Sequence, residues 1–247
     1  MSVVEPSYDD EISAVEPILR ADGLTRVFET AGGKVTAVSD VSLVVHPGEL
    51  VVIRGRSGSG KTTLLNMLGG LDQPTSGQVR LGAVQLTGAA ESELVDIRRS
   101  QIGFVFQAFG LIPVLSAAEN VEVPLRLLGV APEEREARVA ELLALVGLAG
   151  HARQRPAELS GGQQQRVGIA RALACDPKVL FADEPTGQLD SVTGAAMMEL
   201  LVGLVHSKGV AAVVTTHDPL LMARADRVLE LHDGQLADQP RRGRHSA

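Results

Sequence analysis

Cysteine is almost absent from this sequence, and so are long apolar runs. The single Cys175 among 247 residues allows no disulfide within the chain and no cysteine-rich metal site, which suits a reducing cytoplasm. No stretch approaches about 18 consecutive apolar residues and the N-terminus is acidic, so we expect neither a membrane span nor a signal peptide. The formal net charge of −7 argues against a general affinity for nucleic acid.

The two ends of the chain differ in charge. Residues 1–18 are rich in acidic side chains and are interpreted as a solvated tail. Residues 239–247 include three arginines and predict a basic solvated tail, with binding to anionic lipid headgroups as the alternative. The intervening residues 19–238 can bury a substantial core, as one large domain or as a core domain with a subdomain.

A glycine-rich segment joins an apolar run to a helical pattern. Leu50–Ile53 predicts a strand and Leu64–Leu68 the start of a helix, and between them residues 55–62 match the phosphate-loop pattern G-x-x-x-x-G-K-[ST]. Glycines let backbone N–H groups converge on phosphate oxygens, and the helix directs the positive end of its dipole at the same anion. Lys61 can reach the β- and γ-phosphates and the Thr62 hydroxyl can ligate Mg²⁺. The segment therefore predicts binding of a nucleoside triphosphate.

A second segment places polar groups at a helix N-terminus. The sequence Leu-Ser-Gly-Gly-Gln at 159–163 precedes apolar residues at helical spacing, so the serine and glycines lie where a helix begins. The N–H groups and hydroxyl there suit an anion, although Ser160 as an ordinary helix cap is the simpler alternative. The segment Val179–Glu184 favours the anion site. Its four apolar residues and two carboxylates predict a buried strand that delivers acids to the edge where α/β sheets bind ligands.

With these motifs the chain resembles the nucleotide-binding subunits of ATP-binding cassette (ABC) transporters from about residue 18 to residue 238. The motifs of that family occur here in order: the Walker A loop at 55–62, the Q-loop glutamine Gln107, the signature at 159–163, the Walker B Asp183 with the following Glu184, the D-loop Leu189–Asp190 and the switch His217. Six motifs in register leave little room for coincidence.

The resemblance implies a role for each of these side chains. Glu184 would orient or deprotonate the attacking water, and His217 would hydrogen-bond the γ-phosphate. A polar strand end and a structural histidine are the respective alternatives. The catalytic residues would be Glu184, His217, Gln107 and Lys61, and the Mg²⁺ ligands would be Thr62, Gln107 and Asp183.

The resemblance also implies which residues contact ATP. Phe28 would stack on the adenine base, although its apolar segment also suits the core of a strand. The full set of expected nucleotide-binding residues is Phe28, Gly55, Arg56, Ser57, Gly58, Ser59, Gly60, Lys61, Thr62, Thr63, Gln107, Ser160, Gly161, Gly162, Gln163, Asp190 and His217.

The fold implied by the resemblance is α/β, the P-loop ABC ATPase fold with a parallel core sheet, an antiparallel β subdomain and a helical signature subdomain. Alternation and turn signals from 21 to 85 independently predict the antiparallel layer. We expect the helical subdomain at about 108–172, within an ABC ATPase domain at 19–238. After residue 176, strands predicted at 179–183 and 210–216 alternate with helices predicted at 193–205 and 218–224. This order implies a parallel core sheet with right-handed crossovers.

One helix of the helical subdomain can be placed from the residues alone. Pro132 suits the first turn of a helix, and Gly147 suits the position just after its end. Between them, apolar residues recur at helical spacing and predict one buried face, made of Val139, Leu142, Leu143 and Val146.

The segments between the motifs resemble those of subunits that serve macrolide-exporter and lipoprotein-releasing systems. This implies an ATP-hydrolysing subunit at the cytoplasmic face of the membrane. It would form a homodimer around two Mg-ATP and drive a separate transmembrane permease. The alternative is a non-transport ABC ATPase that regulates a cell-division or cluster-assembly complex. A DNA-repair or translation ATPase is disfavoured by the short spacing between Lys61 and Ser160 and by the single cassette.

The segment 108–115 is apolar despite loop signals from Gly110 and Pro113. An apolar loop indicates either internal packing or a partner surface. In the resembled family this region receives a short coupling helix of the permease, so Phe109 and Leu111 are candidates for the wall of that groove.

Overall fold

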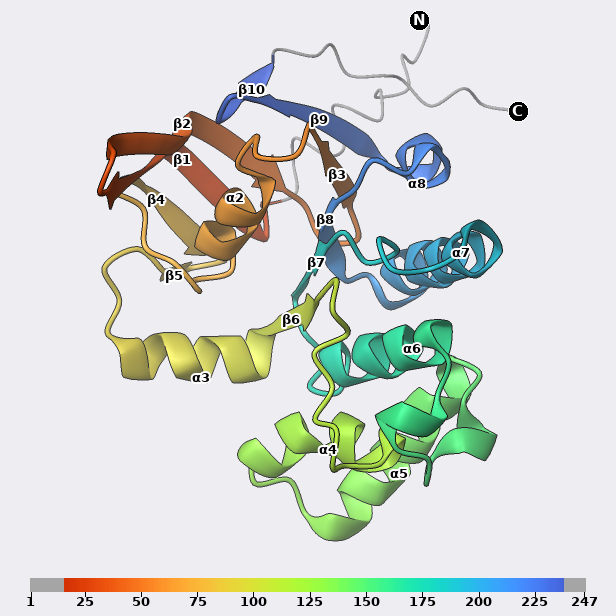
Figure 1. Ribbon diagram of the computed structural model, residues 1–247. Coiled ribbons are helices and arrows are strands. Elements are labelled where there is room, and N and C mark those ends of the chain that lie inside the picture. Colours follow the sequence, from red (N-terminus) through yellow and green to blue (C-terminus); the bar gives the residue numbers. More distant parts are fainter. Residues whose placement is uncertain (1–15, 238–247) are drawn as a thin grey trace, which may run out of the picture.

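The computed structural model describes residues 16–237, which form two sheets surrounded by helices (Figure 1). The tail predicted at 239–247 and all but the last three residues of the one predicted at 1–18 lie outside this range. Within the described residues, no helix combines the length and apolar character needed to cross a membrane.

The smaller sheet is antiparallel throughout and has the strand order β2-β1-β4-β5. Its strands are β1 (Leu19–Thr30), β2 (Gly33–Val45), β4 (Ser76–Leu81) and β5 (Val84–Gln85). This confirms the antiparallel layer predicted from residues 21–85. The long β1–β2 hairpin lies beside α2 in Figure 1.

The larger sheet has the order β10-β9-β3-β8-β7-β6, with parallel pairs from β9 to β6 and an antiparallel β10 at one edge. Its strands are β3 (Leu50–Arg54), β6 (Ile102–Val105), β7 (Val179–Asp183), β8 (Ala211–Thr215), β9 (Arg227–His232) and β10 (Gln235–Ala237). In its centre, Thr215 of β8 is in register with Ile53 of β3 and with Asp183 of β7. The ends of these strands therefore meet at one place.

Helices cover both faces of the larger sheet and extend below it in Figure 1. They are α2 (Lys61–Leu68), α3 (Glu91–Gln101), α4 (Ala117–Leu127), α5 (Pro132–Leu145), α6 (Gly161–Ala172), α7 (Ser191–Lys208) and α8 (Pro219–Arg224), with short 3₁₀ turns at Ala149–His151 and Pro156–Glu158.

The central strands are apolar on both faces because each face has its own core. Leu50 and Val52 of β3 pack into the cluster that contains the apolar faces of α4 to α7. Their neighbours Val51 and Ile53 point the other way, into the cluster shared with α2, α3 and the antiparallel sheet. A strand buried on both faces needs the continuous apolar run that the sequence shows.

Local signals set the helix ends. As predicted, α5 begins at Pro132, buries Val139, Leu142 and Leu143, and is followed by Gly147 with a φ of 72°. The helix predicted at 193–205 is longer, Ser191–Lys208. Its N-terminus lies earlier because the Asp190 side chain caps it, accepting hydrogen bonds from Val192 N–H and Thr193 N–H. Its C-terminus lies later because the helix continues to Gly209, which has a φ of 65°.

Candidate nucleotide-binding site

The glycine loop at residues 55–60 connects β3 to α2 and packs directly on neighbouring backbone. A Cβ added to Gly55 would lie 2.3 Å from the carbonyl oxygen of Leu231, and one on Gly60 would lie 2.2 Å from that of Ala37. Gly58 has a φ of 78°, and nothing lies within 4 Å of the place where its Cβ would be. Positions 55 and 60 therefore accept only glycine, because any side chain there would collide with neighbouring backbone. The loop is open to solvent or ligand at Gly58.

Lys61 folds over this loop. Its Nζ donates to the carbonyl oxygens of Gly55 at 2.8 Å and Arg56 at 3.2 Å, and lies 3.8 Å from Oε1 of Glu184. The side chain is only 10% exposed. The ammonium group is thus held at the centre of the loop, where it can meet a bound anion.

Two threonines bind the carboxylate at the end of β7. Asp183 Oδ2 accepts from Thr62 Oγ1 at 2.8 Å, and Oδ1 accepts from Thr215 Oγ1 at 2.5 Å. Both threonines come from other elements, the start of α2 and the end of β8. The parallel register therefore brings the predicted Mg²⁺ ligands Thr62 and Asp183 into contact.

Glu184 and His217 form a pair beside this carboxylate. Nδ1 of His217 lies 3.1 Å from Oε2 of Glu184, and the His217 side chain is 81% exposed. Gln107 follows the end of β6, and its side chain reaches the backbone just after Glu184: a Cβ added to Gly187 would lie 2.8 Å from Gln107 Nε2. Three motifs that are distant in the sequence thus converge on one edge of the sheet.

These groups surround a hollow of about 610 Å³ at the carboxyl edge of the parallel strands, a volume in the range of small-molecule sites. Its lining residues are Ala37, Gly55, Arg56, Ser57, Gly58, Gly60, Lys61, Thr62, Thr63, Gln107, Asp183, Glu184, Gly187 and His217. Ala37 and Gly187 were missed in the sequence. A small residue within a strand gives no signal, whereas Gly187 follows the two carboxylates closely enough to have been considered.

The signature segment does not line this hollow. Ser160 caps α6: its Oγ accepts from Gln163 N–H at 3.3 Å while Gln163 Oε1 accepts from Ser160 N–H at 2.8 Å. Gly162 packs on α7, since a Cβ there would lie 2.3 Å from Thr193. The cap predicted as the simpler alternative is therefore present, and the Ser160 O–H can still donate to a ligand.

Asp190 and Phe28 also lie outside the lining. Asp190 caps α7, and the hydrogen bonds from Thr193 hold the pKa of its carboxyl below the ordinary value. Phe28 is 36% exposed on β1, so the alternative of a strand-core position is wrong. The guanidinium of Arg26 lies over its ring, 4.5 Å from the centroid.

The donors in the hollow suit Mg²⁺ held together with phosphates. Among residues 16–237 no group of three or more His, Cys, Asp or Glu side chains can hold a metal by itself. Mg²⁺ does not require such a cage, because it commonly takes one or two carboxylates and completes its shell with phosphate oxygens and water. One carboxylate and one hydroxyl in contact, facing an open anion cradle, fit that description.

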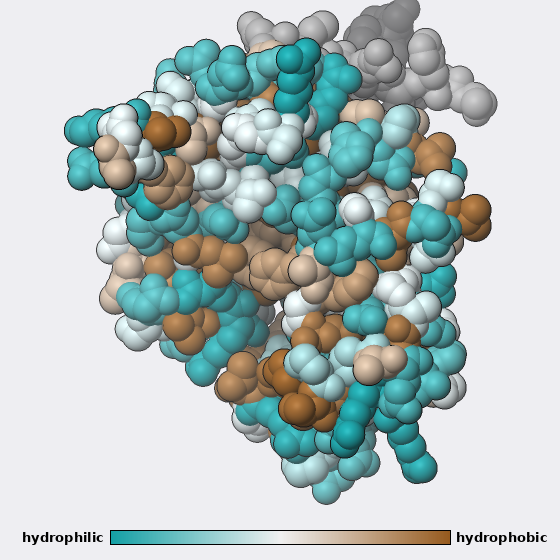
Figure 2. All heavy atoms as spheres, in the orientation of Figure 1, coloured by the Kyte–Doolittle hydropathy of each residue, from teal (hydrophilic) through white to brown (hydrophobic). Residues whose placement is uncertain are grey.

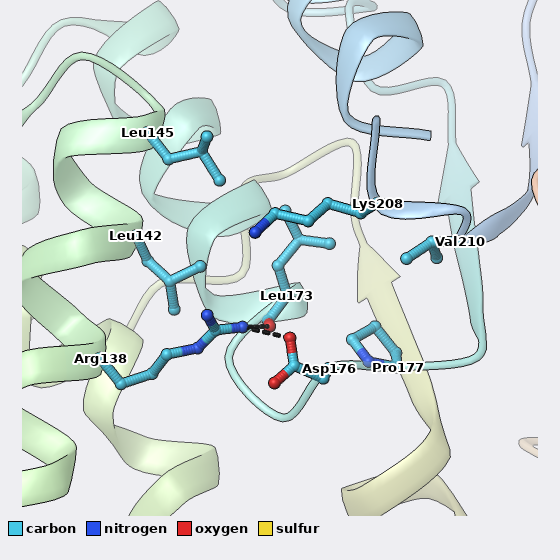
Figure 3. Close-up of a pocket in the computed structure, with 8 residues that line it drawn as sticks. All are labelled: Arg138, Leu142, Leu145, Leu173, Asp176, Pro177, Lys208 and Val210. Carbon is cyan, nitrogen blue, oxygen red and sulfur yellow. Dashed lines mark hydrogen bonds and ion pairs between the residues drawn. The ribbon is translucent and has the colours of Figure 1, made fainter. Parts of the chain in front are cut away.

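A second, smaller pocket lies between α5, the end of α6 and the end of α7 (Figure 3). Arg138 reaches across it to the carbonyl oxygen of Leu173 at 3.2 Å and to the carboxylate of Asp176. Lys208 of α7 pairs with Glu141 of α5 at 3.6 Å. Its cations are thus engaged by neighbouring carboxylates and helix-end carbonyls, as in a structural contact between helices.

Comparison with known proteins gives concordant results. A family model described as "ABC transporter" matches residues 38–187. The lipoprotein-releasing system ATP-binding protein LolD of Chromohalobacter salexigens is 44% identical over 90% of this chain and 94% of its own length. A probable export ATP-binding/permease protein of Pseudomonas fluorescens is 44% identical over 94% of this chain, which spans only 36% of that longer protein. A macrolide export ATP-binding/permease protein MacB of Salmonella typhimurium is 43% identical over 90% of this chain.

Solved structures agree with the sequence matches. The dimeric post-hydrolysis state of the ATP-binding cassette MJ0796 bound to ADP and Pi has a TM-score of 0.84 and 42% identity, over 91% of this chain and 99% of that one. Another dimeric structure of MJ0796, described as a bacterial ABC transporter cassette, also has a TM-score of 0.84, with 43% identity. The predicted fold class is thereby confirmed.

Proposed function

Because this chain belongs to the ABC transporter family, we propose that it is the ATP-binding and ATP-hydrolysing subunit that drives a separate transmembrane permease from the cytoplasmic face of the membrane. The observation that carries the proposal is the hollow at the carboxyl edge of the parallel sheet. Phosphate-binding, metal-binding and water-activating groups from β3, β6, β7 and β8 meet there.

Different residues of the hollow bind the phosphates, hold the metal and activate water. The N–H groups of the glycine loop and Nζ of Lys61 bind the phosphates, and Thr62 and Asp183 hold Mg²⁺, which screens phosphate charge when it is bound. Gln107, which lines the same hollow, would contact the metal and the attacking water. Glu184 takes a proton from that water, and His217, already paired with Glu184, hydrogen-bonds the γ-phosphate.

A second copy of the chain completes each site. The signature residues Ser160 to Gln163 present a helix N-terminus, but none of them lines the hollow of their own chain. A head-to-tail homodimer would bring the signature of one copy to the phosphates bound by the other. The dimeric state of the similar MJ0796 cassette supports this arrangement.

The permease docks on an apolar face beside the Q-loop segment. Figure 2 shows apolar side chains gathered over α4 and the segment before it, beside a hollow that separates this region from α3. The exposed large apolar residues between β6 and α4 are Phe106, Ile112 and Val114. Leu111, by contrast, is only partly exposed and packs against the helical core, so it contributes less to the surface than the sequence suggested. An apolar helix of a membrane partner fits this face.

Sedimentation tests the proposed assembly. Glu184→Gln keeps the shape of the side chain and removes its basicity, so ATP should stay bound and hold two copies together. We expect a dimer with Mg-ATP and a monomer without nucleotide, and Lys61→Ala in the same background should abolish the dimer. A Glu184→Gln protein that stays monomeric in saturating ATP, even with its permease, contradicts the proposal.

A further inference from the structure

One face of the Phe28 ring is covered by a cation. Arg26 and Phe28 are two residues apart on β1, so their side chains project from the same face of the strand. The guanidinium carbon of Arg26 lies 4.5 Å from the ring centroid, within cation–π range. Since Phe28 as a whole remains 36% exposed, the ring still offers surface for a further stacking partner.

The guanidinium of Arg26 is itself held by a carboxylate that is distant in the sequence, that of Asp72. Its Nε donates to Oδ2 of Asp72 at 2.9 Å and its Nη2 lies 2.8 Å from Oδ1, which is the planar two-bond geometry of an arginine–carboxylate pair. Oδ1 of Asp72 also accepts from Gln73 N–H at 2.8 Å. Both charged side chains are about three-quarters buried, so the orientation of the guanidinium plane is well defined.

The loop that carries Asp72 is tied both to β1 and to the phosphate-binding helix. Thr75 N–H donates to the Thr25 carbonyl at 2.8 Å, and Thr75 Oγ1 accepts from Val27 N–H at 3.0 Å. At its other end, Asp72 N–H donates to the Asn66 carbonyl of α2 at 3.2 Å. Helix α2 begins at Lys61, so a continuous set of contacts links the phosphate loop to the Phe28 ring.

The contacts between residues 72–75 and β1 occur where the pairing of β1 with β2 is irregular. The register between β1 and β2 shifts between Leu24 and Arg26, and again between Arg26 and Val27. Such irregularities leave the direction of nearby side chains to other contacts. Here the contacts come from the loop at residues 72–75, whose bonds to Thr25, Arg26 and Val27 bracket the irregular stretch.

We propose that Arg26 and Asp72 are positioning residues of the nucleotide site, which hold the Phe28 ring as a platform for the adenine base of ATP. The inference rests on the proposed function, ATP binding, and on the sequence-based prediction that Phe28 stacks on adenine. Asp72 orients the guanidinium plane, the guanidinium orients the ring, and the ring meets the base at a set distance from the phosphate loop. Ordering the platform before ATP arrives lowers the entropic cost of binding.

The proposal makes arginine specifically necessary at position 26. Lysine keeps the positive charge but has neither the planar fork that matches Asp72 nor the flat surface that stacks on the ring. Asp72→Asn keeps the shape of the side chain and removes the charge that orients the fork. Both variants should therefore disturb base recognition without touching the phosphate loop.

The test compares two probes, Mg-ATP and Mg-tripolyphosphate, which lacks the base. We expect Arg26→Lys and Asp72→Asn each to weaken ATP binding about three- to tenfold, in keeping with a cation–π contact, and to leave tripolyphosphate binding unchanged. Arg20→Lys is the matched control, because Arg20 pairs with Asp22 on the same strand without contacting the ring. It should change neither affinity.

Phe28→Ala separates this inference from the proposed function. It should lower the ratio of ATP to tripolyphosphate affinity, and adding Arg26→Lys should then have no further effect, because Arg26 acts through the ring. If Phe28→Ala leaves the ratio unchanged, stacking on Phe28 itself is wrong. If Phe28→Ala lowers the ratio but Arg26→Lys and Asp72→Asn do not, stacking stands and the positioning role is wrong.

A spectroscopic signal checks the same point in folded protein. The chain contains no tryptophan, so Phe28→Trp introduces one reporter at the platform. We expect ATP to quench its fluorescence. Adding Asp72→Asn should raise the ATP concentration at half-maximal quenching by the same factor by which Asp72→Asn weakens ATP binding in the Phe28 protein. An unshifted midpoint in a protein that melts at the unaltered temperature contradicts the inference.

Discussion

Glu184 has a backbone φ of 44°, in the left-handed region that residues other than glycine rarely adopt. Three hydrogen bonds maintain this conformation. The N–H donates to the carbonyl and the hydroxyl oxygen of Thr215, at 3.0 and 3.1 Å, and the carbonyl accepts from Gly187 N–H at 2.9 Å. Backbone strain that is held in this way is common at functional sites. It aims the carboxylate past the end of β7 and into the hollow.

Glu184→Gln should therefore retain ATP binding and lose hydrolysis by roughly 10²–10⁴-fold, the usual contribution of a positioned base. Lys61→Ala should instead weaken binding of the triphosphate, because its Nζ lies within the loop proposed to receive the phosphates. Equilibrium binding and single-turnover hydrolysis measure the two effects separately. Equal losses of nucleotide affinity in both variants would show that the roles are wrongly divided.

At the scale of elements, α5 is held against the end of α6 by Arg138 (Figure 3). Its Nη2 donates to the Leu173 carbonyl at 3.2 Å and its Nε to the Ala174 carbonyl at 3.4 Å, and it also binds Asp176. These carbonyls lie at the C-terminal end of α6, where helix geometry supplies few donors, and that of Leu173 also accepts from Asp176 N–H at 3.2 Å. Arg138 thus joins two helices by satisfying the end of one of them.

Arg138→Met should lower the free energy of unfolding by about 1–3 kcal/mol, because it keeps the apolar stem and removes the donor to the Leu173 and Ala174 carbonyls and to Asp176. Arg99→Met is the control, since Arg99 makes only an exposed i,i+3 pair with Asp96 and should cost less than about 1 kcal/mol. Urea unfolding measures both. Similar values for the two variants would mean that water replaces Arg138 without loss.

The contact between α4 and α5 depends on pH through Glu122. Hydrogen bonds from Arg126 and then Arg135, both at 2.7 Å, hold the pKa of this carboxyl below its ordinary value. A lowered pKa in the folded state means that the stabilisation is complete above the ordinary carboxyl pKa, about 4.3, and is lost as pH falls through the lowered value.

Glu122→Gln should accordingly reduce stability at pH 7 and make a smaller difference near pH 3, because below the ordinary carboxyl pKa the unfolded state already binds the proton. Urea unfolding of both proteins at the two pH values measures this. Glu199→Gln, which disrupts an exposed pair with Arg224, provides the comparison. A difference between native protein and Glu122→Gln that is equal at both pH values would contradict the assignment.

At the scale of the whole molecule, the hollow proposed to bind nucleotide and the apolar face beside α4 are joined by one short segment. Gln107 lines the hollow, and the chain then runs over the helical core to Val114, which is 73% exposed. Phe109 and Gly110 take left-handed conformations, and their carbonyls accept from Arg171 at 3.3 and 2.6 Å. Burial lowers the pKa of the Arg171 guanidinium from its ordinary value. The segment is therefore anchored at its middle and exposed at its end.

Val114→Asp should uncouple the permease while leaving ATP hydrolysis by the isolated subunit nearly unchanged, because the side chain contacts neither the hollow nor the core. The matched control is Val84→Asp, an exposed valine on β5 in the antiparallel sheet. Co-purification with the permease and its stimulation of ATPase activity are the measurements. Full stimulation of Val114→Asp would show that the permease docks elsewhere.

The sequence by itself determined the features that depend on local chemistry. The apolar runs of β3 and β7, the first-turn proline and end glycine of α5, and the Asp190 cap and end glycine of α7 depend on neighbours a few residues apart. The glycine loop, the two carboxylates after β7 and the signature cap could be read for the same reason, since each is a short pattern with one geometric outcome. Through the family resemblance that they carry, these motifs predicted the fold class and most of the lining of the hollow.

Only the tertiary structure decided what depends on residues far apart in the chain. Four such features leave no periodic trace in the sequence: the pairing of Asp183 with Thr215, the separation of the signature from the hollow, the partial burial of Leu111 and the contact of Asp72 with Arg26. Each results from which strands are neighbours and how loops return to them. Strand order in a parallel sheet is set by crossover connections and packing of both faces, which local residue patterns do not encode.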